Sequence, residues 1–261
     1  MRGRVLIIAG SDSGGGAGAQ ADIKTVTRLG GYAATAITAI TVQNTLGVSA
    51  VHPIPPEIVA AQGRAVLCDI GADAIKTGML GSAAVVEITA ALLDEARVPA
   101  VIDPVMVAKG GAALLDANAV ATFKRLLIPR AALLTPNGPE AEALTGVAVT
   151  DLEGARRAAQ ALLAAGAAAV LIKGGHIPGP RVIDLLATPV GETLFENERI
   201  ETRHTHGTGC TLASAIATGL AQGLPLTEAV AEGWAYVAEA IRQAPGLGQG
   251  HGPLNHGWLL R

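Results

Sequence analysis

The chain has 261 residues, of which 50% are hydrophobic and 16% charged, and its formal net charge is −3. This length and composition exclude a disordered or collagen-like chain, and they suit one α/β domain over residues 1–261. Only 2% of the residues are aromatic, and 19 basic residues stand against 22 acidic ones. We therefore expect neither nucleic acid nor an anionic membrane as a partner.

The two cysteines, Cys68 and Cys210, are too far apart in the sequence to form a CxxC pair. No disulfide framework is indicated, so a reducing cytoplasm is the expected location. The first apolar run is too short for a signal peptide. The uncharged stretch 205–227 is interrupted by Gly, Pro and polar residues, so no membrane span is expected.

Apolar runs bounded by Gly or Pro alternate with Ala- and Leu-rich stretches, which is the pattern of a mostly parallel sheet covered by helices. Strands are predicted at 4–10, 33–41, 72–78, 99–106, 131–137 and 167–175, with an edge or flap strand at 48–54. Helices are predicted at 19–30, 83–95, 117–127, 139–144 and 152–165, and others begin after 55–56 and from about 207 and 226. Residues 181–188 and 192–202 are expected to pair as antiparallel strands, with a hairpin turn near Gly191.

The loop after the first predicted strand, GSDSGGGAGAQADIK (10–24), is rich in glycine. Gly14, Gly16 and Ala19 satisfy the G-x-G-x-x-A pattern of dinucleotide sites, but residues 41–44 lack the acidic residue that this pattern requires. A dehydrogenase is therefore disfavoured. A tight turn alone would account for some of the glycines, yet the triple glycine favours a functional loop.

A second glycine-rich segment, THGTGCTLASAIATG (205–219), opens a predicted helix of small residues. Unpaired backbone N–H groups and the positive end of the helix dipole would meet at Gly207, Thr208 and Gly209, which predicts an anion-binding site. Cys210 follows in the first turn, where the dipole is expected to lower the thiol pKa so that a thiolate can act as a base. A buried core cysteine is the alternative. No Walker A sequence is present, which excludes a P-loop NTPase.

These two segments, with ITVQNT (40–45), IKTGMLG (75–81), DPVM (103–106), TPNGPEAEALTG (135–146) and KGGH (173–176), resemble in order the hydroxymethylpyrimidine/phosphomethylpyrimidine kinases of thiamine biosynthesis. The resemblance covers nearly the whole chain. It implies a ribokinase-like α/β fold, with a central mostly parallel sheet, helices on both faces and a small flap. It also implies that ATP and Mg²⁺ are used to phosphorylate 4-amino-5-hydroxymethyl-2-methylpyrimidine and then its monophosphate.

The resemblance also implies roles for individual residues. Gln43 would read the aminopyrimidine through its amide, and the pocket would be completed by Gly10, Asp22 and Met79. The residues implied for ATP are Asn137, Lys173 and Thr208, and those for catalysis are Cys210, Gly207 and Gly209. Asp103 and Glu140 would hold Mg²⁺, although either could instead be a charge at a helix N-terminus. His176 and His206 are expected to position loops, and His251 and His256 to be solvated.

Two other functions remain open. A pyridoxal kinase of the same superfamily is the nearest alternative, because a pyridine ring with a hydroxymethyl arm would fit a similar pocket. A pyrimidine-sensing module without catalysis is less favoured, because a sensor needs no machinery for a γ-phosphate. We expect a homodimer whose partners are ATP and a small pyrimidine.

Overall fold

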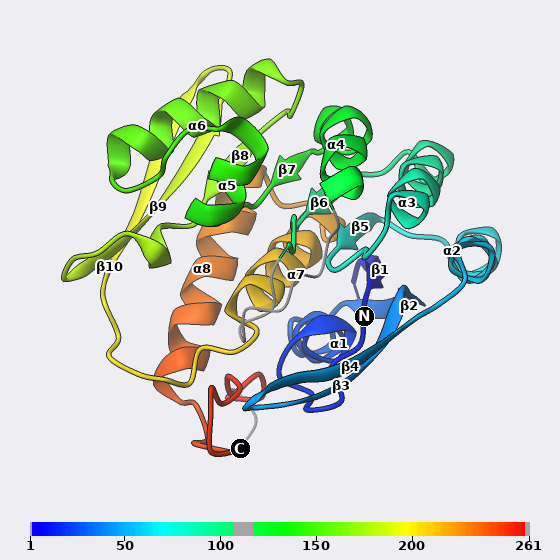
Figure 1. Ribbon diagram of the computed structural model, residues 1–261, viewed down its shortest axis with the longest axis horizontal. Coiled ribbons are helices and arrows are strands. Elements are labelled where there is room, and N and C mark those ends of the chain that lie inside the picture. The colour runs from blue at the N-terminus through cyan, green and yellow to red at the C-terminus, as the bar shows by residue number, and fades with distance from the viewer. Residues whose placement is uncertain (1, 107–116, 259–261) are drawn as a thin grey trace.

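The computed structural model describes residues 2–106 and 117–258, and the described residues contain an eight-stranded sheet with helices on both faces (Figure 1). Its strand order is β10-β9-β8-β7-β6-β5-β1-β2. The pairs from β2 to β8 are parallel, and β9 and β10 are antiparallel additions. The strands of this sheet are β1 (Arg4–Ala9), β2 (Tyr32–Ile37), β5 (Ala74–Thr77), β6 (Ala100–Ile102), β7 (Leu133–Leu134), β8 (Val170–Ile172), β9 (Arg181–Thr188) and β10 (Gly191–Glu198).

The helices agree with the sequence prediction to within a residue or two at the ends that it specified. They are α1 (Gly18–Arg28), α2 (Pro56–Asp69), α3 (Ala83–Ala96), α4 (Ala117–Leu126), α5 (Gly138–Thr145), α6 (Leu152–Ala164), α7 (Thr208–Ala221) and α8 (Leu226–Arg242), with short 3-10 turns at Ile128–Arg130 and Gly174–His176. In the part of the chain that the structure describes, no helix is long and apolar enough to cross a bilayer.

The sheet is buried on both faces because successive side chains of its strands point to opposite sides. Leu6 and Ile8 of β1 join the core beneath helices α2 to α6. Val5 and Ile7 join the core beneath α1, α7 and α8 (Figure 1). All four side chains are fully buried. The continuous apolar run of β1 therefore serves two cores, as the sequence pattern predicted.

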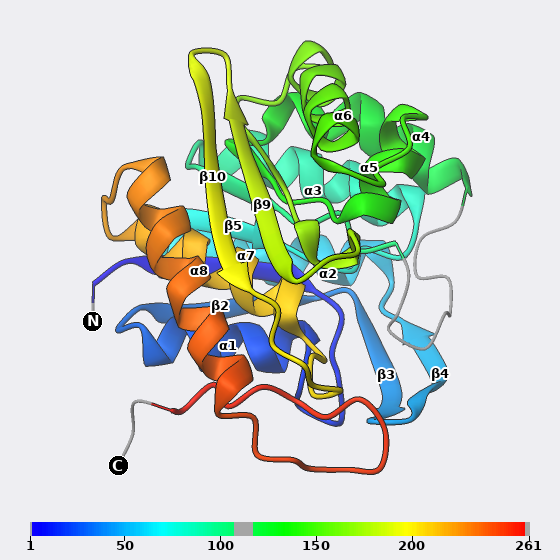
Figure 2. The same cartoon turned by 90° about the vertical axis from the view of Figure 1, so that its left-hand side faces the viewer.

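The single strand predicted at 33–41 is wrong, because the chain forms two strands there. β2 ends at Ile37, and β3 (Ala39–Asn44) pairs antiparallel with β4 (Gly47–Pro53) in a separate two-stranded flap. β1 ends at Ala9, so the residues after Ile37 have no neighbouring strand in the main sheet and pair with β4 instead. The predicted flap strand at 48–54 is confirmed as β4, and Figure 2 shows the flap projecting from the sheet.

The segment after α8 runs past the tip of this flap (Figure 2). The His251 backbone N–H donates to the Thr45 carbonyl oxygen at 2.8 Å, and the His206 N–H donates to the Gly252 carbonyl oxygen at 3.1 Å. A Cβ on Gly250 would overlap the Thr45 carbonyl, so this approach requires glycine. The C-terminal segment thus joins the flap to the loop before α7.

Candidate active site

A pocket of about 910 Å³ opens at the carboxyl edge of the parallel strands, where α/β sheets of this kind bind ligands. Every predicted site residue except Asp22 lines it. Those residues are Gly10, Gln43, Met79, Asp103, Asn137, Glu140, Lys173, Gly207, Thr208, Gly209 and Cys210. We call this cavity the main pocket.

The loop before α7 has the geometry of an anion site. Gly207 is the N-cap residue and has a φ of +83°, and a Cβ there would overlap the carbonyl oxygen of Gly16. A Cβ on Gly209 would stand 3.1 Å from Lys173 Nζ. The hydroxyl and the backbone N–H of Thr208 both donate to the Thr205 carbonyl, at 2.8 and 3.3 Å.

Lys173, Asp103 and Glu140 form a charged cluster beside this loop. Lys173 Nζ lies 2.8 Å from Asp103 Oδ1 and 3.8 Å from Glu140 Oε2. Burial raises the pKa of Glu140 to about 7, although the charge of Lys173 opposes this rise and that of Asp103 adds to it. Among the described residues, no group of three or more His, Cys, Asp or Glu side chains could hold a metal by itself.

Asn137 and Glu140 also start helix α5. The Asn137 side chain accepts from the Glu140 N–H at 2.9 Å, and Glu140 Oε2 accepts from the Asn137 N–H at 2.8 Å. This reciprocal pair is a capping box. Glu140 is therefore a charge at a helix N-terminus, which was the alternative to a Mg²⁺ ligand. Glu140 also lines the main pocket.

Cys210 lies in the first turn of α7, but the expected lowering of its thiol pKa is wrong. Burial raises the pKa of Cys210 to about 11, and the charges of Asp22 and Asp103 act in the same direction. Lys76 opposes the rise. Loss of hydration thus outweighs the helix dipole, and the thiol is the resting form at neutral pH.

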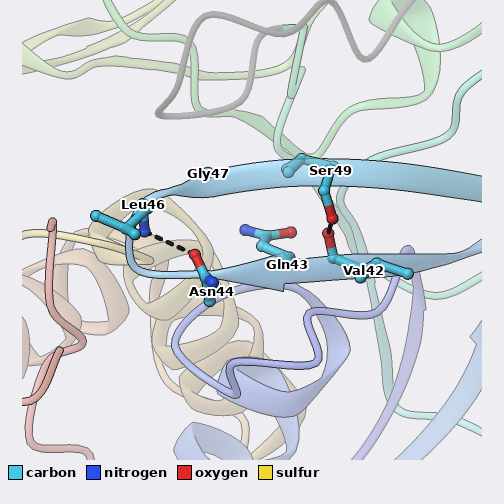
Figure 3. Close-up of a pocket in the computed structure, with 7 residues that line it drawn as sticks. Val42, Gln43, Asn44, Leu46, Gly47 and Ser49 are labelled. Carbon is cyan, nitrogen blue, oxygen red and sulfur yellow. Dashed lines mark hydrogen bonds between the residues drawn. The ribbon is translucent and has the colours of Figure 1, made fainter. Parts of the chain in front are cut away.

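Gln43 projects from the flap strand β3, and Figure 3 shows its side chain with its neighbours on the flap. Its Oε1 lies 3.1 Å from Thr41 Oγ1, and its Nε2 lies 3.2 Å from His206 Nε2. The same histidine nitrogen is 2.8 Å from Asp12 Oδ2. The Asp12 carboxylate accepts from His206 Nε2, so His206 does position loops, as expected, and its ring lies beside the Gln43 amide.

Asp12 is a site residue that the sequence reasoning missed. Its carboxylate accepts the N–H groups of Gly14, Gly16 and Ala17, which braces the first glycine-rich loop. Burial opposes ionisation, yet His206 and these N–H groups hold the pKa of Asp12 below its usual value. An acidic residue two positions before a triple glycine was the available signal.

Asp22 does not line the pocket, contrary to the expectation from the sequence. It is fully buried behind the wall, where Oδ2 bonds to Lys76 Nζ at 2.7 Å and Oδ1 accepts from Ser214 Oγ at 2.7 Å. Lys76 lines the pocket in its place. The sequence signal for Lys76 was a lysine inside the buried strand AIKT (74–77).

The prediction of a solvated His256 is also wrong. The side chain is 5% exposed, and its Nε2 lies 3.0 Å from Thr211 Oγ1 of α7. Burial lowers the pKa of His256 to about 4. His251 is exposed, as predicted.

The sequence model of the phosphomethylpyrimidine kinase family matches residues 12–255. A hydroxymethylpyrimidine/phosphomethylpyrimidine kinase of Streptomyces coelicolor is 50% identical over 256 residues, which cover 98% of this chain and 95% of that protein. The thiamine biosynthesis bifunctional protein ThiED of Geobacter sulfurreducens is 55% identical over 256 residues, and the chain spans 52% of its length.

Among solved structures, the pyridoxal kinase of Staphylococcus aureus in complex with AMP-PCP and pyridoxal superposes with a TM-score of 0.91. Its sequence is 33% identical, and the match covers 98% of this chain and 94% of that one. The chain therefore belongs to the phosphomethylpyrimidine kinase family, and its α/β fold is ribokinase-like.

Proposed function

We propose that this kinase transfers the γ-phosphate of ATP to 4-amino-5-hydroxymethyl-2-methylpyrimidine and then phosphorylates the resulting monophosphate. One observation carries the proposal: a single pocket is lined by Gln43, by the helix start at Gly207 and Gly209, and by Lys173. We call the part beside Gln43 the pyrimidine end and the part beside Gly209 and Lys173 the nucleotide end. The name of the Streptomyces relative, at 50% identity over nearly its full length, supports the same two substrates.

The pyrimidine end suits an aminopyrimidine edge, because a glutamine amide carries a donor beside an acceptor. Thr41 has one hydroxyl hydrogen, and its shorter contact, 2.8 Å, is to the Ser11 carbonyl. The Gln43 carbonyl oxygen thus keeps acceptor capacity for the 4-amino group. Met79 Sδ lies close to Gly10 and offers an apolar wall to the ring.

The nucleotide end suits the phosphates of ATP. Backbone N–H groups at the start of α7 and the ammonium group of Lys173 supply positive charge where the γ-phosphate would be transferred. The fold neighbour from Staphylococcus aureus carries AMP-PCP, which supports a nucleoside triphosphate as the donor. Asn137 would contribute from the start of α5.

The residues present fit Mg²⁺, because this ion is usually held by one or two carboxylates and by substrate phosphates. Asp103 uses Oδ1 for Lys173 and Thr135, whereas Oδ2 has no hydrogen bond among the described residues. Asp103 and Glu140 would hold the ion together with ATP. When bound, it would neutralise charge on the phosphates.

Cys210 is proposed as the base that takes the proton of the hydroxymethyl group. Its thiolate is a minor form, since its pKa is about 11, so the base acts through a small population. The second acceptor is a phosphate oxyanion and needs no base. The two steps therefore depend differently on Cys210.

Pyridoxal is a second candidate substrate. The observation that favours it is the match to the Staphylococcus aureus pyridoxal kinase with its pyridoxal bound. Gln43 favours the aminopyrimidine instead, because a pyridine lacks the 4-amino group.

The test is a panel of hydroxymethylpyrimidine, its monophosphate and pyridoxal, each incubated with ATP and Mg²⁺ and analysed by product mass. We expect one phosphate to be added to each pyrimidine, at a higher kcat/KM than for pyridoxal. Phosphorylation of pyridoxal alone would make the protein a pyridoxal kinase. Pyrimidine binding without any ATP consumption would make it a sensor.

We also propose that residues 1–261 act as one kinase domain, as a homodimer, in the cytoplasm. Ile40, Val42 and Leu46 leave an apolar surface exposed on the flap, which favours association of two copies. Cys68 and Cys210 are both free thiols, which favours a reducing compartment. Sedimentation of the purified protein tests the dimer.

A further inference from the structure

Lys76 is a fully buried lysine at the end of β5. Its ion pair with Asp22 is oriented, because Lys76 lines the main pocket whereas Asp22 lies behind it, bonded to Ser214 of α7. The positive end of the pair therefore faces the pocket.

The ammonium group of Lys76 has unused hydrogen-bonding capacity. An ammonium carries three N–H donors, and in residues 2–106 and 117–258 the one hydrogen bond found from it goes to Asp22. Burial alone would lower the pKa of Lys76, but Asp22, Cys210 and Asp103 raise it above its usual value, so the group stays charged. A buried cation with donors to spare favours an anionic ligand.

The Lys76 ammonium group lies close to where the hydroxymethyl group or ester phosphate of the pyrimidine would be bound. Lys76 Nζ lies 3.1 Å from the point where a Cβ on Gly78 would stand, and Gly78 directly precedes Met79 at the pyrimidine end. Lys173 has two carboxylates beside it, Asp103 at 2.8 Å and Glu140 at 3.8 Å, whereas the ion pair of Lys76 among the described residues is with Asp22.

We propose that Lys76 is the specificity-determining residue for the second phosphorylation: its ammonium group binds the ester phosphate of the pyrimidine monophosphate. The inference rests on the proposed function. The first acceptor is a neutral alcohol and the second carries a phosphate of up to two negative charges, so one pocket must accept both. An ammonium group already balanced by Asp22 admits the alcohol without an unpaired buried charge and then supplies donors to the ester.

The test is the double variant Asp22→Asn/Lys76→Met, which removes both charges at nearly constant volume. Replacing both members of a buried pair is tolerated far better than removing one. Calorimetry without nucleotide would compare binding of the monophosphate and of the alcohol. We expect monophosphate affinity to fall about 10- to 100-fold, as for loss of a charged hydrogen bond, with a much smaller change for the alcohol. Ser214→Ala, which keeps the ion pair, is the matched control and should leave the ratio of the two affinities unchanged.

Equal losses for both ligands in a folded double variant would overturn the proposal. A second measurement needs no variant: a ³¹P titration of the bound monophosphate should show a phosphate pKa below its free value of about 6, and an unshifted or raised pKa would also overturn it. The two proposals fail differently. A wild type that binds both ligands but transfers no phosphate contradicts the proposed function alone. An active wild type with an unchanged affinity ratio in the double variant contradicts the role of Lys76 alone.

Discussion

Lys173 Nζ lies 2.8 Å from Asp103 Oδ1, so the lysine expected to meet ATP is paired with the carboxylate expected to meet Mg²⁺. Burial alone would lower the pKa of Lys173, but Asp103 and Glu140 hold it above its usual value. The cluster is thus partly neutralised before ligands arrive. Binding of a metal–nucleotide complex would exchange this internal pairing for contacts with the phosphates.

The substitution Lys173→Met is expected to lower kcat by about 10²- to 10³-fold, because a fixed charge that stabilises the transferred phosphoryl group is lost. Pyrimidine affinity should not change. Steady-state kinetics and calorimetry measure the two quantities. Lys124→Met, on the exposed surface of α4, is the control. A wild-type kcat in Lys173→Met would remove this lysine from the transfer step.

Gln43→Leu is expected to weaken pyrimidine binding by about 1 to 3 kcal/mol, because polar edges of the ring would lose their partners. ATP binding should stay nearly unchanged. Ser49→Ala is a matched control, since it removes a hydroxyl of the same flap that bonds to the Val42 carbonyl. An unchanged pyrimidine affinity in Gln43→Leu would exclude Gln43 from recognition.

Crowding the helix start at Gly209 should stop transfer while the pyrimidine still binds. A Cβ there stands 3.1 Å from Lys173 Nζ and 3.6 Å from Asp103 Oδ2, so Gly209→Ala should impair turnover and Gly209→Val abolish it. Assays of ATP consumption, with pyrimidine binding measured in parallel, check this order. Near-normal turnover in Gly209→Val would mean that the phosphate binds elsewhere.

Cys210→Ala should depress phosphorylation of the alcohol by about 10²- to 10⁴-fold and affect the monophosphate reaction much less. Cys210→Asp should restore part of the first step, but its fixed charge would oppose the incoming phosphate of the second. The measurement is kcat/KM for both substrates. Equal losses in both steps would show that Cys210 only shapes the helix start.

The pH dependence of the wild type gives a further check on the same role. Because the thiol pKa of about 11 lies above neutral pH, the thiolate fraction rises about tenfold per unit between pH 7 and 9. The kcat/KM for the alcohol should therefore rise with pH over this range, whereas the kcat/KM for the monophosphate should not.

The stability of the protein should fall as the pH drops from about 6.5 to 4, in part because of His256. Its folded pKa of about 4 lies below the usual histidine pKa of 6.5, so the unfolded chain binds more protons in this window and protonation favours unfolding. A shift of this size corresponds to up to about 3 kcal/mol. Urea unfolding of His256→Gln should show a weaker dependence on pH than the wild type. His251→Gln, at an exposed position, should behave as the wild type does.

Most elements were predictable because buried parallel strands and helices leave different apolar patterns. The division between β2 and β3 could not be predicted, because the apolar pattern of the sequence continues through Thr38. The pairing of β2 stops at Ile37 because its neighbour β1 ends at Ala9. The end of β2 therefore depends on a strand that pairs with it only in the folded protein.

The site was predictable where chemistry is local, as at the two glycine-rich loops and the polar residues after strands. The site could not be predicted where two side chains that contact each other lie far apart in the sequence. Lys76 meets Asp22 across 54 positions, and Thr211 meets His256 across 45. The raised pKa of Cys210 comes from burial, which only the packed structure determines.

The contact between the C-terminal segment and the flap sets an order for assembly of the pocket. Gln43 is synthesised early, but the Thr45 carbonyl beside it is paired by the N–H of His251, more than two hundred residues later. While the chain is being made, the main sheet can form before that partner has left the ribosome. The C-terminal segment also accepts the N–H of His206, directly before the helix start at Gly207. Both the flap and the loop before α7 would therefore gain their final shape only when this last segment docks, so a nascent chain would have the sheet before it had a working pocket.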